Sequence, residues 1–113
     1  MRGPTAAAFP YAGPPELAAP IEAALRRVVD PEVALGIVDL GLVYGVTVQD
    51  RRVHVRMTMT SAACPVTGVI VDEVEAELDA VLPADCVIAV EVVWAPAWTP
   101  ARMSDDARVF MGW

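Results

Sequence analysis

The stretch that most constrains the fold is residues 53–95, where a strand-like, a helix-like and a second strand-like segment follow one another. In VHVRMTMT, residues 53–60, apolar and polar side chains alternate, which is typical of a strand with one face partly exposed to solvent. Residues 65–82 carry apolar side chains at helical spacing, and residues 86–95, CVIAVEVVWA, form another apolar run. Such a unit makes its two strands parallel, with a right-handed crossover.

The remaining segments complete a two-layer α/β domain. LVYGVTV, residues 42–48, precedes the polar turn QDRR and predicts a hairpin with residues 53–60. An apolar stripe over residues 21–29 predicts a first helix, with Pro20 in its first turn and its end near Asp30 and Pro31. Ser104 is a plausible N-cap for a short last helix. The order α-β-β-α-β-α predicts a three-stranded mixed sheet in one domain over residues 16–113, after a flexible, proline-broken segment 1–15.

Composition excludes several classes of function. The chain of 113 residues has a net charge of −7, which argues against nucleic acid or an anionic membrane as partner. No uncharged apolar run reaches the ~18 residues of a membrane span. No signal peptide is recognisable, so we expect a cytoplasmic protein with reduced cysteines. Because 56% of the residues are hydrophobic, we expect a homodimer that buries the remaining sheet edge or the loop 94–98.

The predicted topology brings three distant segments to one edge of the sheet. These are the start of the first strand (residues 39–41), the end of the second (60–64) and the end of the third (94–103). Ligands of open α/β sheets favour the carboxyl ends of parallel strands. We therefore expect Asp39, Thr60 and Arg102 around Cys64, with Arg102 either neutralising an anionic ligand or simply pairing with an acid.

Cys64 has two readings from its position alone. Pro65 suits the first position of a helix and makes Cys64 the N-cap, where the helix dipole favours a thiolate. A buried, inert cysteine is the other reading. Cys86 begins the third strand, ~26 Å away along the sheet, so a disulfide is not expected. His54, ~20 Å along its strand from Thr60, is expected to be a solvated strand histidine.

Three quoted motifs resemble one family. VVDPEVALGIVDLGLVYGV, MTMTSAACPVTGVI and APAWTPARMSDDAR, in this order, resemble the small metal–sulfur (iron–sulfur) cluster assembly factors, SufT-like and PaaD-like. The likeness covers about residues 20–112. PaaD-like members often carry a further cysteine-rich tail, which does not follow Trp113, so the SufT-like type is favoured. The positions that match the motifs are Asp30, Pro31, Glu32, Asp39, Gly41, Thr60, Cys64, Pro65, Arg102 and Met103.

The resemblance implies an α/β fold similar to iron–sulfur assembly domains and a role in maturing or delivering clusters. It makes Cys64 the reactive or metal-ligating residue, holding iron or a cluster transiently, with the assembly machinery and client apoproteins as partners. One thiolate does not supply the four ligands that a cluster usually takes. Two alternatives stay open: a thiol enzyme with Cys64 as nucleophile and Asp39 as orienting acid, and a non-catalytic interaction adaptor.

Overall fold

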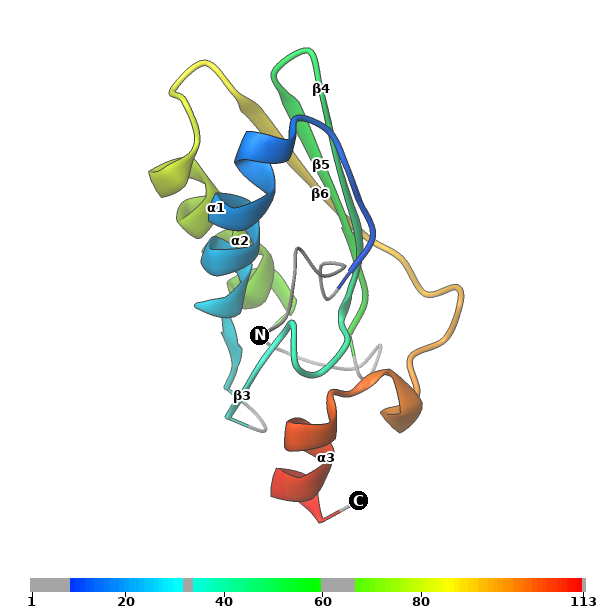
Figure 1. Ribbon diagram of the computed structural model, residues 1–113. Helices are drawn as coiled ribbons and strands as arrows, with labels where there is room; N and C mark the ends of the chain where they lie inside the picture. Colours follow the sequence, from blue (N-terminus) through cyan, green and yellow to red (C-terminus); the bar gives the residue numbers. More distant parts are fainter. Residues whose placement is uncertain (1–8, 32–33, 60–66, 113) are drawn as a thin grey trace.

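Two helices cover one face of a four-stranded sheet in the computed structural model, and a third, short helix lies below the end of the sheet (Figure 1). The structure describes residues 9–31, 34–59 and 67–112. The elements in chain order are β1 (Tyr11–Ala12), α1 (Pro15–Arg26), β2 (Val29–Asp30), β3 (Leu35–Gly36), β4 (Val43–Gln49), β5 (Arg52–Met57), α2 (Thr67–Val81), β6 (Val87–Val92), the 3-10 turn η1 (Pro100–Arg102) and α3 (Asp105–Met111).

The central hairpin and the strand–helix–strand unit are confirmed. The order in the sheet is β1-β4-β5-β6, with β4 and β5 antiparallel and β5 and β6 parallel. Asp50 and Arg51 join β4 to β5 with positive φ angles of 51° and 66°. Two such residues in succession are typical of the tight turn whose twist matches that of the flanking strands. The hairpin is therefore fixed by its turn as well as by its alternating side chains.

The sheet has four strands, not the three expected. The additional strand, β1, pairs parallel with β4, Tyr11 opposite Val46. It comes from the segment expected to be a flexible lead-in, where Phe9 is buried. The Tyr11 hydroxyl donates to the Pro14 carbonyl at 2.6 Å. Burial, and secondly the charge of Glu16, raise the pKa of Tyr11 above its usual 10.0.

The first helix also differs from the expectation. It begins at Pro15, so Pro20 lies inside the helix rather than in its first turn. It ends at Arg26, before the predicted end near Asp30, because Val29 and Asp30 pair with β3. The last helix begins as predicted: the Ser104 side chain accepts a hydrogen bond from the Ala107 N–H at 3.1 Å.

The core lies between the sheet and the helices α1 and α2. From β5, the side chains of Val53, Val55 and Met57 are fully buried. The helices contribute buried side chains from one stripe each: Ile21, Ala24 and Leu25 of α1, and Ile70, Val74 and Leu78 of α2. Among the residues that the structure describes, no helix covers the opposite face of the sheet (Figure 1).

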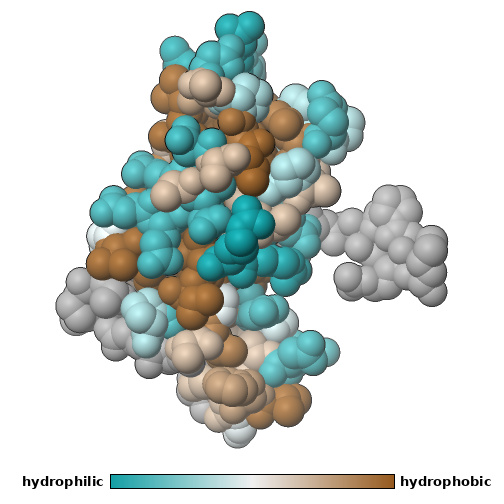
Figure 2. Space-filling view, turned by 90° about the vertical axis from the view of Figure 1, so that its left-hand side faces the viewer, coloured by the Kyte–Doolittle hydropathy of each residue, from teal (hydrophilic) through white to brown (hydrophobic). Residues whose placement is uncertain are grey.

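The outer surface of the helix layer mixes hydrophilic and hydrophobic side chains, and hydrophobic ones also occur at the lower end, where α3 lies (Figure 2). In α3, the side chains of Val109 and Phe110 are exposed. None of the helices in the described part of the chain has the length and apolar character needed to cross a membrane.

Candidate functional site

The carboxyl ends of β5 and β6 and the start of β4 meet at one end of the sheet. The Thr58 N–H donates to the Leu42 carbonyl at 2.8 Å, and the Val93 N–H donates to the Met57 carbonyl at 2.8 Å. These two bonds continue the pairing beyond the strands themselves. Figure 1 shows the loop before β4 and the chain after β6 both arriving at this end, above α3. The predicted convergence of the segments around residues 39–41 and 94–103 is confirmed.

Residues 94–103, here called the strap, are fastened to residues 39–44 by two hydrogen bonds. The Tyr44 hydroxyl donates to the Pro96 carbonyl at 2.6 Å, and the Trp98 indole N–H donates to the Leu40 carbonyl at 2.7 Å. Directly after the strap, the Ser104 N–H donates to the Asp39 carbonyl at 2.7 Å. The strap therefore has a defined place over the start of β4.

Gly41 makes the closest approach between the two segments. A Cβ at this position would lie 2.6 Å from the carbonyl carbon of Arg102 and 2.7 Å from its Cβ. The backbone at Gly41 also has a φ of 74°, which side-chain-bearing residues rarely adopt. The residue after Arg102, Met103, is buried in the core. Glycine is thus the residue that lets the Arg102 backbone dock here.

The guanidinium of Arg102 stacks on an aromatic ring and is not paired with a carboxylate of the described residues. Its guanidinium carbon lies 4.4 Å from the centroid of the Tyr44 ring. Within the part of the chain that the structure describes, Arg102 has no ion pair. A stacked guanidinium keeps its N–H donors available for an anion. Arg102 therefore has the geometry expected of an anion-binding residue.

Tyr44 was not predicted as a site residue, although it orients the strap at two points. It lies at a β-bulge, where the register between β4 and β5 shifts between Val43 and Gly45. Bulges of this kind commonly re-aim a side chain beside a functional site. The sequence signal available was the tyrosine within the quoted motif LVYGV, but alternation alone does not reveal a bulge.

The backbone of Asp39 lies where residues 39–44 meet the strap, but its carboxylate lies near Arg26 and not near Arg102. The nearest guanidinium is that of Arg26, whose Nη1 lies 3.7 Å from Asp39 Oδ1, and Arg26 also pairs with Glu22 at 3.0 Å. The Asp39 side chain is 46% exposed. The backbone of Asp39 is therefore brought close to the strap, while its carboxylate stays accessible.

The predicted residues Thr60 and Cys64, with Glu32 and Pro65, lie outside the described residues. The description ends at Met59, two residues after the end of β5, and resumes at Thr67, the first residue of α2. Among residues 9–31, 34–59 and 67–112, no three His, Cys, Asp or Glu side chains come together as metal ligands.

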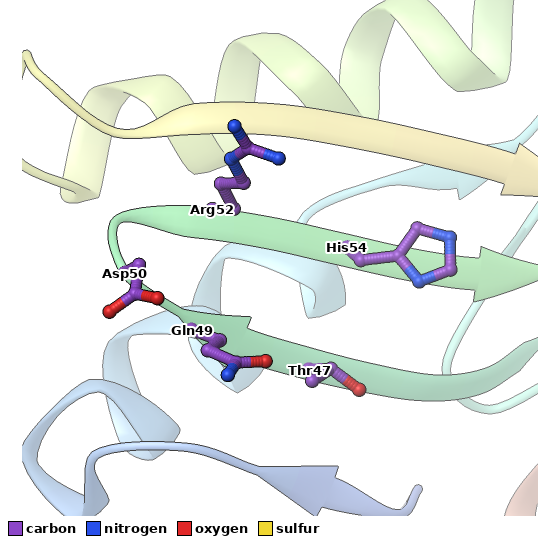
Figure 3. Close-up of a pocket in the computed structure, with 5 residues that line it drawn as sticks. All are labelled: Thr47, Gln49, Asp50, Arg52 and His54. Atoms are coloured by element: carbon purple, nitrogen blue, oxygen red, sulfur yellow. The ribbon is translucent and has the colours of Figure 1, made fainter.

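The second cysteine lies at the opposite end of the sheet. Cys86 is free and precedes Val87, whose N–H donates to the Arg51 carbonyl in the hairpin turn at 2.8 Å. His54 projects from the open face of the sheet and lies 2.9 Å from Glu91 Oε1. Beside it is a pocket of about 450 Å³, lined by Thr47, Gln49, Asp50, Arg52 and His54 (Figure 3). This pocket flanks the hairpin rather than the strap.

The family model described as iron–sulfur cluster assembly protein matches residues 18–92. The chain belongs to this family. An iron–sulfur protein maturation auxiliary factor of Bacillus subtilis, YitW, is 46% identical over 93 residues, which is 81% of this chain and 90% of the relative. The maturation auxiliary factor SufT of Staphylococcus aureus is 44% identical over 75% of this chain and 97% of its own length. The SufT-like resemblance of the motifs is thus confirmed.

Two solved structures of similar proteins show the same fold. A domain of unknown function, DUF59, from Bacillus anthracis superposes with a TM-score of 0.77 at 43% identity, covering 81% of this chain and 88% of that one. A conserved hypothetical protein from Thermotoga maritima gives a TM-score of 0.72 at 36% identity, covering 90% of this chain and 97% of its own. The mixed α/β architecture is therefore shared with these two solved structures.

Proposed function

We propose that this chain is a maturation factor for iron–sulfur proteins, which holds iron or a cluster transiently through Cys64 and passes it to client apoproteins. The names of the Bacillus subtilis and Staphylococcus aureus relatives, both iron–sulfur protein maturation auxiliary factors, support this role. The cargo, iron or cluster, is what the protein handles and is not a resident cofactor.

The observation that carries the proposal is the docking of the strap on residues 39–44 at the carboxyl end of β5. Two segments that match the family motifs, 39–41 and 102–103, meet there through the Gly41–Arg102 contact. The strand β5 leads from this point directly into the third motif segment, which contains Thr60 and Cys64. The topology thus supports a site built from all three segments.

The residues have distinct chemical roles in the proposal. Cys64 supplies a thiolate ligand, and the N-cap position that the sequence predicts for it before Pro65 would favour that form. Arg102, stacked on Tyr44, offsets the negative charge of a thiolate-bound cargo. Thr60 contributes a hydroxyl, and Asp39 an accessible carboxylate. Since a cluster usually takes four ligands, the others come from a second copy or from the client, which makes binding transient.

The proposed partners are the iron–sulfur assembly machinery, client apoproteins and a second copy of the chain. Support for the second copy comes from the edge of β6 and the uncovered face beside it. The N–H groups of Val87 and Val93 donate to β5 and to the turn before it, so the alternate residues Ile88, Val90 and Val92 turn their backbone N–H and C=O groups away from β5. We propose a cytoplasmic location, since the ligand chemistry requires a reduced Cys64.

Anaerobic reconstitution with iron and sulfide tests the proposal. The wild-type chain should develop the visible absorption of a sulfur-ligated cluster, and Cys64→Ser should not. Cys86→Ser is the matched control, because it removes the other cysteine at the far end of the sheet and should load normally. Loading that survives in Cys64→Ser, or is lost equally in Cys86→Ser, contradicts the role given to Cys64.

Thiol labelling against pH separates a carrier from a thiol enzyme or an adaptor. A carrier thiolate should label readily at neutral pH in the metal-free protein and become protected when iron is added. A nucleophile without a metal role should label equally with and without iron. An adaptor should show an ordinary cysteine titration in both states.

A further inference from the structure

The face of the sheet opposite α1 and α2 carries two adjoining hollows. The first is the pocket of about 450 Å³ beside the hairpin, lined by residues of β4, β5 and the turn between them (Figure 3). The second, of about 250 Å³, lies nearer the strap, and its lining includes Ala12, Tyr44, Gly45 and Arg56. Thr47 lines both hollows. They therefore form one groove along β4 and β5, from the hairpin turn to Tyr44, here called the sheet groove.

The sheet groove arises because short side chains of one strand lie beside long side chains of the next. In the ladder between β4 and β5, Gly45 lies opposite Arg56. Two residues further on, Thr47 lies opposite His54. Residues that lie directly opposite each other project from the same face of a sheet. The short side chains of β4 thus form the floor of the groove, and the long ones of β5 form its wall.

The wall of the sheet groove carries guanidinium groups that have no carboxylate partner. Arg52 and Arg56 are exposed, and neither forms an ion pair with any residue that the structure describes. Glu91 lies opposite Arg56 in the ladder, but its carboxylate lies 2.9 Å from His54 instead. Arg102, stacked at the strap end of the groove, adds a third guanidinium. These cations favour an anionic ligand.

The surroundings of the groove limit how long that anion can be. The chain as a whole has a net charge of −7, and both ends of the groove are acidic. Asp50 lies in the hairpin turn at one end, and Asp105 and Asp106 begin α3 shortly after the strap at the other. A long polyanion such as a nucleic acid would extend beyond the groove and meet these acids. A short acidic segment of a protein fits between them.

The spacing of the arginines selects an extended segment. Arg52 and Arg56 are four residues apart on one strand, which separates them by ~13 Å along the strand at ~3.3 Å per residue. Carboxylates four residues apart in an extended peptide have the same spacing and project from the same side. In an α-helix, residues four apart are separated by only ~6 Å along the axis. An extended chain thus matches the arginines, and a helix does not.

We propose that the sheet groove binds an extended acidic segment of a partner protein, in which two carboxylates four residues apart pair with Arg52 and Arg56. Each guanidinium can bind a carboxylate through two parallel hydrogen bonds. The uncharged floor at Thr47 accommodates a small residue midway between the two acids. This surface goes beyond the proposed function, because it involves neither Cys64 nor the cargo.

Fluorescence anisotropy tests the proposal with a labelled peptide of serine and threonine that contains two glutamates four residues apart. The parent chain should bind this peptide, and added salt should weaken binding, because the charges are exposed. Arg52→Gln and Arg56→Gln should each weaken binding about fivefold, the effect of losing one well-formed exposed ion pair. Arg108→Gln is the matched control, because it removes the same charge from α3, outside the groove, and should bind as the parent does.

A second peptide of the same composition, with its two glutamates adjacent, separates spacing from charge. It reaches only one of the two guanidinium groups and should bind about fivefold more weakly than the first peptide. Equal affinity for the two peptides would overturn the proposed spacing. Unchanged affinity in both Arg52→Gln and Arg56→Gln would overturn the groove as the binding surface.

Two other results would assign the groove to a different occupant and so reject the proposal. One is an oligothymidylate that binds in preference to the acidic peptide at the same salt concentration, which would indicate a nucleic acid. The other is a parent chain that light scattering shows to be oligomeric while Arg52→Gln or Arg56→Gln is monomeric, which would indicate a second copy of the chain.

Reconstitution with iron and sulfide separates the groove from the cargo site. Arg52→Gln and Arg56→Gln should load as the parent does, and loss of loading would place these arginines in the cargo site and reject a separate docking surface. Peptide binding is measured on the metal-free protein. Failure of the parent chain to load would therefore reject the proposed function and leave the result for the groove standing.

Discussion

At the scale of single residues, Gly41 is the position where both the local backbone conformation and the docking of the strap require that no Cβ is present. Its positive φ and its contact with the Arg102 backbone both exclude a Cβ. These two constraints act on different parts of the structure. The first concerns the turn into β4, and the second concerns the docking of the strap.

Gly41→Ala should therefore lower the free energy of unfolding by more than ~1–3 kcal/mol, the cost of a strained backbone position alone, because the strap must also move. Chemical denaturation measures this change, and reconstitution measures the effect on the site.

Two other glycines provide matched controls. Gly112→Ala meets the same positive φ, at 77°, but no atom lies within 4 Å of its Cβ, so it should show backbone strain only. Gly68→Ala, in α2 with no neighbour within 4 Å, should raise helix stability by ~0.5–1 kcal/mol. If Gly41→Ala is no worse than Gly112→Ala, the contact with Arg102 does not hold the strap.

At the scale of elements, the strap depends on Tyr44 for two separable interactions. The hydroxyl bonds to Pro96, and the ring lies under Arg102. Tyr44→Phe removes only the first, with an expected loss of about 1 kcal/mol. Tyr44→Leu removes both interactions. Trypsin cleavage after Arg102, followed by mass spectrometry, should be slow in the parent chain, moderately faster in Tyr44→Phe and fastest in Tyr44→Leu. Equal rates in all three would show that Tyr44 does not fasten the strap.

Tyr11 in the short strand β1 is expected to make the stability of the fold decrease at alkaline pH. The pKa of Tyr11 is raised in the folded protein, firstly by burial and secondly by Glu16. A folded pKa above the unfolded value contributes stability that is complete below pH ~10 and is lost as pH rises through the folded pKa. Tyr11→Phe should thus be less stable than the parent near neutral pH, and the difference should shrink above pH ~10. Denaturation at a series of pH values measures it; a constant difference would contradict the expectation.

The elements that carry a strong side-chain period were predictable from the sequence, and those fixed by tertiary contacts were not. Alternation in residues 53–60 and the stripe in residues 65–82 predicted β5, α2 and their parallel partner β6. Strand β1 has only two residues, which lie close to prolines, so no alternation of side chains can be recognised in its sequence. The strand forms only because it pairs with β4. The bulge at Tyr44 likewise depends on the pairing of β4 with β5 and not on the local sequence. Convergence of residues 39–41 with the strap followed from topology alone, whereas the hydrogen bonds that fasten it did not.

At the scale of the whole molecule, helices occupy one face of the sheet, while the other face and the β6 edge have no covering element in the described structure (Figure 1). The edge strand contains neither lysine nor proline, the residues that commonly block pairing between edges. Exposed Val87 adds apolar surface beside it. A second copy related by a two-fold axis would extend the sheet through this edge.

The expected product of that pairing is a dimer of two 12.0 kDa chains, measured by light scattering at micromolar concentration. In an antiparallel β6 pair, Ala89 lies near the middle of the strand, so Ala89→Lys brings two like charges close together and should give monomers. Ala80→Lys adds the same charge on the exposed side of α2 and should remain dimeric. A monomeric parent chain would reject the dimer. If Ala89→Lys is still a dimer, the interface does not lie at the β6 edge. The strap is then the next surface to test, because Trp94 is exposed on it.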